Sequence, residues 1–244
     1  MKNLNSDLVD MLPAYFGHPP DFFGITHMSE TNRRSHSLII CQPLLGEAIW
    51  THWALKQIAQ WAARDGYDVF RFDFSGTGNS MVDSTTLALA NWTGDVEKAL
   101  DLMEERCGNS RVSVLAVRLG FAVAASVSFR RDIENLIGWD PVLDGRTWLA
   151  DRKIDLEDHG DGTCDLQGIA LQAEFLAELE ALEIRNVDSV QATAVTTASH
   201  TWDYPPEHMG IDVIKSTDTW NWREPLPALF YAHESVRLVC EQLS

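Results

Sequence analysis

The sequence lacks several features that would assign it to other classes of protein. It has no apolar run near the ~20 residues that a membrane-spanning helix needs, and its N-terminus has no basic segment followed by an apolar one. Its four cysteines lie far apart and form no C-x-x-C pair, so zinc and redox motifs have no support. We therefore expect a cytoplasmic protein with free, mostly buried thiols, no membrane insertion, and neither a metal nor another cofactor.

Basic residues are also scarce. The chain has 19 Lys and Arg against 36 Asp and Glu, which gives a net charge of −17. Nucleic acids and anionic membranes are bound through basic patches, so this balance argues against both as partners. We expect a small molecule as the partner, and the sequence leaves a homodimer open.

Apolar patterns along the 244 residues predict an α/β protein. Aromatic runs within residues 13–28, split by Pro19-Pro20, predict an antiparallel pair at a sheet edge. Strands are predicted at 37–41, 67–73, 111–117, 136–139, 192–197 and 212–215, and helices at 50–64, 89–106, 119–130 and 225–243. Strands and helices that alternate at this spacing indicate a mostly parallel sheet with helices on both faces.

Residues 144–187 interrupt this alternation. We expect a helical lid insertion there, with one helix over residues 164–182 and an acidic, solvated face. The expected organisation is one domain, with core segments 1–143 and 188–244 around the insertion. Trp50, Trp53 and Trp61 share a face of the helix at 50–64, and we expect them in the core.

Residues 116–120 read Ala-Val-Arg-Leu-Gly between a predicted strand and a predicted helix. This context is typical of a nucleophile elbow, in which Gly-x-Ser-x-Gly presents a serine above the sheet. Arg118 occupies the serine position. A guanidinium stays protonated and cannot act as a nucleophile, so the fold is easier to predict here than the chemistry.

The order and spacing of these segments resemble the α/β-hydrolase superfamily over essentially the whole chain. Residues 73–80 resemble its D-x-x-G-x-G-x-S turn. Three further segments resemble a bacterial subgroup with a Leu-Arg-Leu-Gly elbow, which includes exosortase-A-associated hydrolase-like and serine aminopeptidase-like proteins; they are 41–47, 117–120 and 139–145. The resemblance implies the α/β-hydrolase fold and a small acyl-, ester- or thioester-type molecule as ligand.

A serine hydrolase of this fold also needs a histidine base after the last strand and a carboxylate before it. Residues 216–224 contain no histidine. His233 falls inside the last helix, where we expect a packing role. His200 and His208, in the loop after the strand at 192–197, are the other candidates to reach the site.

Carboxylates are present at the expected sheet edge. Glu47, Asp140 and Asp218 each follow a predicted parallel strand, so we expect them to face Arg118. Three interpretations stay open: an ion-pair network that closes a former site, an Arg118 that binds a ligand carboxylate, phosphate or thioester carbonyl, and a carboxylate that activates water. We expect the ligand pocket to be lined by Leu44, Leu45, Leu119, Trp220, Trp222 and His200.

Whether the protein is an enzyme is open on these grounds. The first hypothesis is an α/β-hydrolase-like protein that handles an acyl-type molecule without a Ser-His-Asp triad. The alternative is a non-catalytic relative that binds a ligand or serves as a scaffold.

Overall fold

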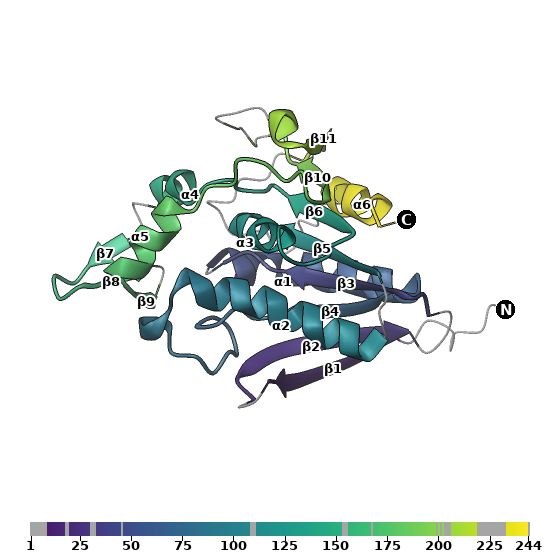
Figure 1. The fold of residues 1–244 in the computed structure, drawn as a ribbon, viewed down its shortest axis with the longest axis horizontal. Helices are drawn as coiled ribbons and strands as arrows, with labels where there is room; N and C mark the ends of the chain where they lie inside the picture. Colours follow the sequence, from purple (N-terminus) through teal and green to yellow (C-terminus); the bar gives the residue numbers. More distant parts are fainter. Residues whose placement is uncertain are drawn as a thin grey trace.

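The structure is a computed structural model. It describes residues 9–17, 20–29, 33–44, 46–107, 111–152, 156–166, 168–198, 200, 202, 206–218 and 233–243. Its centre is an eight-stranded sheet with the strand order β1-β2-β4-β3-β5-β6-β10-β11 (Figure 1). The strands are β1 (Val9–Phe16), β2 (Phe22–Ser29), β3 (His36–Cys41), β4 (Asp68–Phe72), β5 (Arg111–Val117), β6 (Asn135–Trp139), β10 (Gln191–Thr196) and β11 (Ile211–Lys215).

The sheet is parallel from β4 to β11 and antiparallel at one edge. There β1 pairs with β2, and β2 pairs with β4, both antiparallel. The other neighbouring strands, from β4–β3 to β10–β11, run parallel. The predicted mostly parallel sheet and the predicted antiparallel edge pair are therefore confirmed.

Helices cover both faces of the sheet, as predicted. They are α1 (Gly46–Arg64), α2 (Leu89–Cys107), α3 (Leu119–Ser128) and α6 (His233–Glu241). Side chains of α2 and α3 belong to one apolar core, and side chains of α1 and α6 belong to a second core on the opposite face. Strands β3, β4 and β5 contribute to both cores, which explains their near-continuous apolar sequences.

The expected core position of the α1 tryptophans is wrong for two of them. Trp53 is 66% exposed and Trp61 is 37% exposed. The buried face of α1 consists of small and aliphatic residues, among them Ala54, Leu55 and Ile58. Because small side chains let a helix pack closely on a sheet, Trp53 and Trp61 lie outside that contact, whereas Trp50 is partly buried against the core.

The insertion is not the single helix that we predicted. It contains α4 (Gly145–Arg152), β7 (Leu156–Asp158), β8 (Thr163–Leu166), β9 (Ile169–Gln172) and α5 (Ala173–Ala181). Strands β7, β8 and β9 form a separate antiparallel sheet. Gly168, at φ +85°, and the Asp165 carboxylate, which accepts from the Gly168 N–H at 2.7 Å, turn the chain between β8 and β9. The apolar spacing predicts one helix over residues 164–182, but this turn divides that segment.

Two smaller observations complete the fold. Cys41 and Cys164 are free and buried, and Cys240 is buried, which agrees with the expected burial of these three thiols. Among the described residues, none of the helices combines the length and the apolar character that crossing a membrane requires.

Candidate functional site

The elbow after β5 has the sharp geometry of a strand-turn-helix junction. Arg118 has φ 54° and ψ −128°, a conformation that non-glycine residues rarely adopt and that costs roughly 1–3 kcal/mol. Its N–H donates to the Trp139 carbonyl at 3.1 Å, and its carbonyl accepts from Val142 N at 3.1 Å. The neighbouring strand β6 and the residues after it therefore hold the strained turn in place.

Gly120 lets the elbow approach β3 closely. A Cβ atom at this position would lie 2.9 Å from the Gln42 carbonyl oxygen and 3.3 Å from the Cys41 carbonyl oxygen. Any larger residue would push α3 away from the end of β3. The glycine that the elbow pattern predicts is therefore required by this close packing.

The Arg118 side chain is buried in an ion pair. Its Nε donates to Glu47 Oε1 at 3.2 Å, and its Nη1 donates to the Asp140 carbonyl oxygen at 3.3 Å. Arg118 is 5% exposed and Glu47 only 1%. Glu47 lies in the first turn of α1, where the helix dipole favours a carboxylate. The structure therefore brings the first two predicted partners of Arg118 to the elbow.

Asp140 is held at the end of β6 by the end of β10. It has a positive φ of 43°, and its N–H donates to the Val195 carbonyl at 2.9 Å. Its carboxylate accepts from Thr197 N at 2.6 Å and from Thr197 Oγ1 at 2.9 Å. The Nδ1 atom of His200 lies 3.8 Å from Asp140 Oδ1, so of the two candidate histidines this one reaches the site.

His200 is positioned by its neighbours. Its N–H donates to the Thr197 carbonyl at 3.1 Å, and its ring packs edge-on against Trp202 at 4.5 Å between centroids. His208 is instead exposed in a short 3-10 helix, Pro206–Met209.

Asp218 has a different role from the one expected. Its carboxylate accepts from Ser235 N at 2.8 Å and so caps the first turn of α6, and its carbonyl accepts from Ala198 N at 2.7 Å. In the described part of the chain, no hydrogen bond or ion pair joins Asp218 to Arg118. The residue after the last strand therefore anchors a helix.

The predicted pocket residues have mixed outcomes. Leu44 and Leu119 are 1% and 0% exposed and belong to the apolar core between the sheet and α2 and α3. Their role in a pocket stays a prediction. Leu45, Trp220, Trp222 and the side chain of His233 lie outside the described residues.

Sequence reasoning missed two groups at this edge. One is Thr197, whose place directly after a parallel strand could have indicated it. The other is a link between two loops: Asp73 accepts from Gln42 Nε2 at 2.7 Å and from Asn79 N at 2.8 Å. This link fixes the loop after β3, which leads to Glu47, against the turn after β4.

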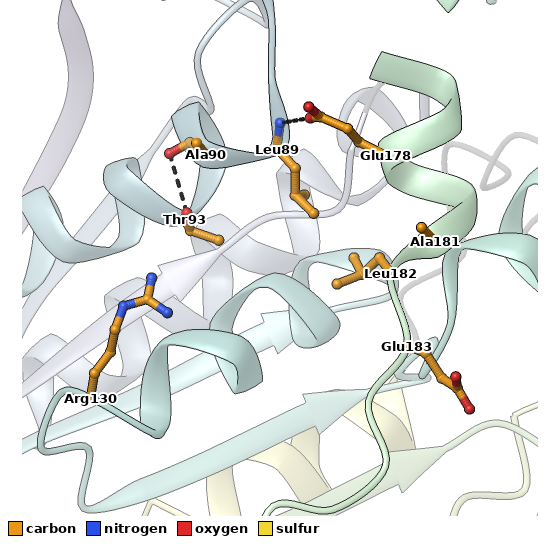
Figure 2. Close-up of a pocket in the computed structure, with 8 residues that line it drawn as sticks. All are labelled: Leu89, Ala90, Thr93, Arg130, Glu178, Ala181, Leu182 and Glu183. Atoms are coloured by element: carbon orange, nitrogen blue, oxygen red, sulfur yellow. Dashed lines mark hydrogen bonds between the residues drawn. The ribbon is translucent and has the colours of Figure 1, made fainter. Parts of the chain in front are cut away.

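The insertion borders a groove of about 510 Å³ (Figure 2). Figure 2 shows α5 on one side of it and the first turn of α2 on the other, and Glu178 Oε2 accepts from Leu89 N at 2.5 Å between them. The carboxylate thereby satisfies a free N–H at the start of α2. The groove is lined by Leu89, Ala90, Thr93, Arg130, Glu178, Ala181, Leu182 and Glu183, so it is separate from the elbow residues.

Comparison with known proteins identifies the fold. No protein-family model and no curated protein matches this sequence. Among solved structures, alpha/beta hydrolase domain-containing protein 10 from mouse is 14% identical, with a TM-score of 0.63 over 95% of this chain and 96% of that chain. An esterase domain from a Rhodothermus marinus protein is 13% identical, with a TM-score of 0.63 over 96% of each chain.

A third similar structure is Est1E from Butyrivibrio proteoclasticus with ferulic acid bound. It is 14% identical, with a TM-score of 0.58 over 91% of this chain and 93% of that chain. The chain therefore has the α/β-hydrolase fold, as predicted. Similarity at this level of identity shows the fold alone, and the Leu-Arg-Leu-Gly subgroup stays a prediction.

Proposed function

We propose that this protein is an α/β-hydrolase-like protein that binds a small acyl-, ester- or thioester-type molecule and does not perform serine hydrolysis. The observation that carries the proposal is the buried ion pair at the elbow tip. Arg118 takes the position of the nucleophile, and its Nε contacts Glu47 Oε1 at 3.2 Å. A protonated guanidinium has no lone pair with which to attack a carbonyl carbon.

The charge around Arg118 bears on the kind of ligand. Glu47 is 1% exposed and its carboxylate pairs with the guanidinium, whereas the buried Asp140 contacts the guanidinium through its backbone carbonyl oxygen. Glu47 already pairs with the Arg118 guanidinium, and the acidic side chain of Asp140 is buried close by, so a second anion at the elbow is disfavoured. The arrangement therefore favours an uncharged carbonyl of an ester or thioester over a ligand carboxylate or phosphate.

Turnover and labelling assays test this proposal. The purified chain is incubated with a fluorophosphonate probe, with p-nitrophenyl butyrate and with butyryl and octanoyl thioesters. We expect no labelled serine and no hydrolysis above the buffer rate, but quenching of tryptophan fluorescence on titration with methyl butyrate or methyl octanoate. Stoichiometric labelling of a serine would overturn the proposal.

A second candidate function rests on the pair formed by Asp140 and His200. A carboxylate 3.8 Å from an imidazole nitrogen can orient a histidine that removes a proton from water. In that case water itself would attack an acyl carbonyl near the elbow. Wild-type hydrolysis that resists fluorophosphonate, falls on acidification and is lost in His200→Gln would support this function over pure binding.

Four further features stay predictions: a lid role for the insertion at 144–187, a homodimer, a cytoplasmic location and a scaffold role. The lid role can be tested by proteolysis. The acyl-ligand proposal would gain support if methyl octanoate protected α5 from proteolysis, because a lid that closes on a ligand becomes less accessible.

A further inference from the structure

A second cluster of polar side chains lies away from the elbow, between α1 and the antiparallel edge of the sheet. Arg71 on β4 and His27 on β2 face α1, and Arg71 Nε donates to His27 Nε2 at 3.1 Å. Arg71 is 8% exposed and His27 is 0% exposed. Two potentially cationic groups are therefore packed together in the interior.

Apart from His27 Nε2, the described residues offer this pair no acceptor for its donors. Because His27 Nε2 accepts from Arg71, the neutral imidazole carries its proton on Nδ1. Nδ1 is buried and has no hydrogen-bond partner. In the part of the chain that the structure describes, Arg71 forms no salt bridge with any carboxylate. An unpaired buried charge is rare, because its desolvation is not compensated.

The surroundings increase the positive charge. His52 and Lys56 lie four residues apart on α1, and both Arg71 and Lys56 act electrostatically on His27 and His52. Burial, together with these cations, lowers the pKa of His27 to about 3. Burial also lowers the pKa of Arg71 to about 10, although Asp73 acts in the opposite direction.

Among the described residues, one carboxylate acts on this cluster, and it is already engaged in hydrogen bonds. Asp73 acts electrostatically on Arg71 and His52. Its Oδ1 accepts from Gln42 Nε2 at 2.7 Å, and its Oδ2 accepts from Asn79 N at 2.8 Å and Asn79 Nδ2 at 3.2 Å. Asp73 therefore serves the turn after β4 and leaves the donors of the cluster unmatched.

We propose that Arg71, His27, Lys56 and His52 form a binding site for a small oxyanion, either a carboxylate or a phosphate group. Such a group offers only acceptors and negative charge, which is what these donors lack. His52 is exposed and Lys56 is half-buried, so these two residues lie on the solvent side of the proposed site, and Arg71 and His27 lie on its buried side. The site is independent of the function proposed for the elbow, since it shares no residue with it.

Thermal melts of the full chain test this site. Sodium phosphate and sodium acetate are titrated separately at constant ionic strength, adjusted with sodium chloride, because screening alone stabilises a chain of net charge −17. Above the Kd, each tenfold rise in the preferred anion should raise the wild-type Tm by about 3–6 °C. The anion that gives this response distinguishes a phosphate site from a carboxylate site.

Two arginine variants make the test specific. Arg71→Met should lose the anion response and, without anion, melt at or above the wild-type temperature, since it removes an uncompensated charge. Arg111→Met is the matched control, because Arg111 is exposed at the start of β5 and pairs with Glu134; it should keep the full response. A wild-type Tm that ignores both anions, or an Arg71→Met variant that responds like wild type, would overturn the proposal.

A milder variant and a spectroscopic signal cover the case in which Arg71→Met does not fold. Lys56→Gln, at the entrance, should weaken the anion affinity by about two- to fivefold. The imidazole nitrogen resonances of His27 should shift on saturation with the preferred anion. Unchanged His27 resonances at saturation would place the bound anion elsewhere and refute the site.

Discussion

Removal of one partner from the Arg118–Glu47 ion pair should destabilise the protein strongly. The two atoms lie 3.2 Å apart, and the side chains are 7% and 1% exposed. At an effective dielectric constant of 20 their attraction is about 5 kcal/mol, and loss of one partner of a buried pair typically costs about 3–5 kcal/mol. Arg118→Met and Glu47→Leu should each lower the free energy of unfolding by that amount.

The double variant should recover most of the loss. Replacement of a buried ion pair by apolar residues of similar volume is often neutral or stabilising, because neither charge remains to be desolvated. In a domain of this size the single variants should melt about 6–20 °C below wild type, and the double variant near it. Urea melts followed by tryptophan fluorescence and far-UV circular dichroism would measure the free energy of unfolding of the wild type, the two single variants and the double variant.

The backbone offers an internal control. Arg118→Gly removes the same ion pair but relieves the strain of φ 54°, so it should be about 1 kcal/mol more stable than Arg118→Ala. Single variants that lose less than about 1 kcal/mol, or a double variant no more stable than the singles, would refute the view that this pair stabilises the elbow.

Three further predictions concern other parts of the structure. Thr197→Val should cost about 1.5–3 kcal/mol, because it removes a hydroxyl that donates to the buried Asp140 carboxylate. Gly120→Ala should cost about 1–3 kcal/mol, because its Cβ would meet the Gln42 carbonyl at 2.9 Å. His27 has a pKa of about 3 in the folded protein, so on acidification the unfolded chain takes up this proton first. The free energy of unfolding should therefore fall as the pH drops from about 6.5 towards 3. His27→Gln should reduce that slope by up to about 1.4 kcal/mol per pH unit.

Matched variants keep these predictions falsifiable in the same urea melts. Thr193→Val removes a hydroxyl from β10 that forms no hydrogen bond in the described structure, so it should change stability far less than Thr197→Val. Gly94→Ala, in α2, adds a Cβ with no atom within 4 Å and should stabilise the helix by up to about 1 kcal/mol. Equal effects within either pair, or a His27→Gln slope equal to wild type, would contradict the contacts described.

Local patterns predicted most of the core and failed in the insertion. The strand at residues 111–117 was predicted with the bounds that β5 has, because a buried parallel strand is a short apolar run before a turn. Residues 164–182 carried apolar positions compatible with a helix. The turn at Gly168 and the pairing of β8 with β9 divide this segment. The spacing of apolar residues along the chain does not reveal which strands pair with each other.

The site was predictable in part for a similar reason. Residues at the carboxyl ends of parallel strands gather at one edge, which led to Glu47, Arg118 and Asp140. The same rule pointed to Asp218, but its carboxylate bonds to the first turn of α6. The rule predicts where a residue after a strand lies, but the neighbouring residues determine the direction in which its side chain points.

The sequence by itself determined that position 118 carries a guanidinium, which cannot attack a carbonyl carbon, because that charge is a property of the residue alone. It also determined the alternation of strands and helices that places Arg118 at the sheet edge. Only the tertiary structure decided that this charge is buried and paired with a carboxylate. Its partner Glu47 lies 71 residues away and meets it because β3 and β5 are neighbours in the sheet, and Thr197 clamps Asp140 because β6 and β10 are neighbours. Strand order sets these contacts, and strand order depends on the packing of the whole chain rather than on any local pattern.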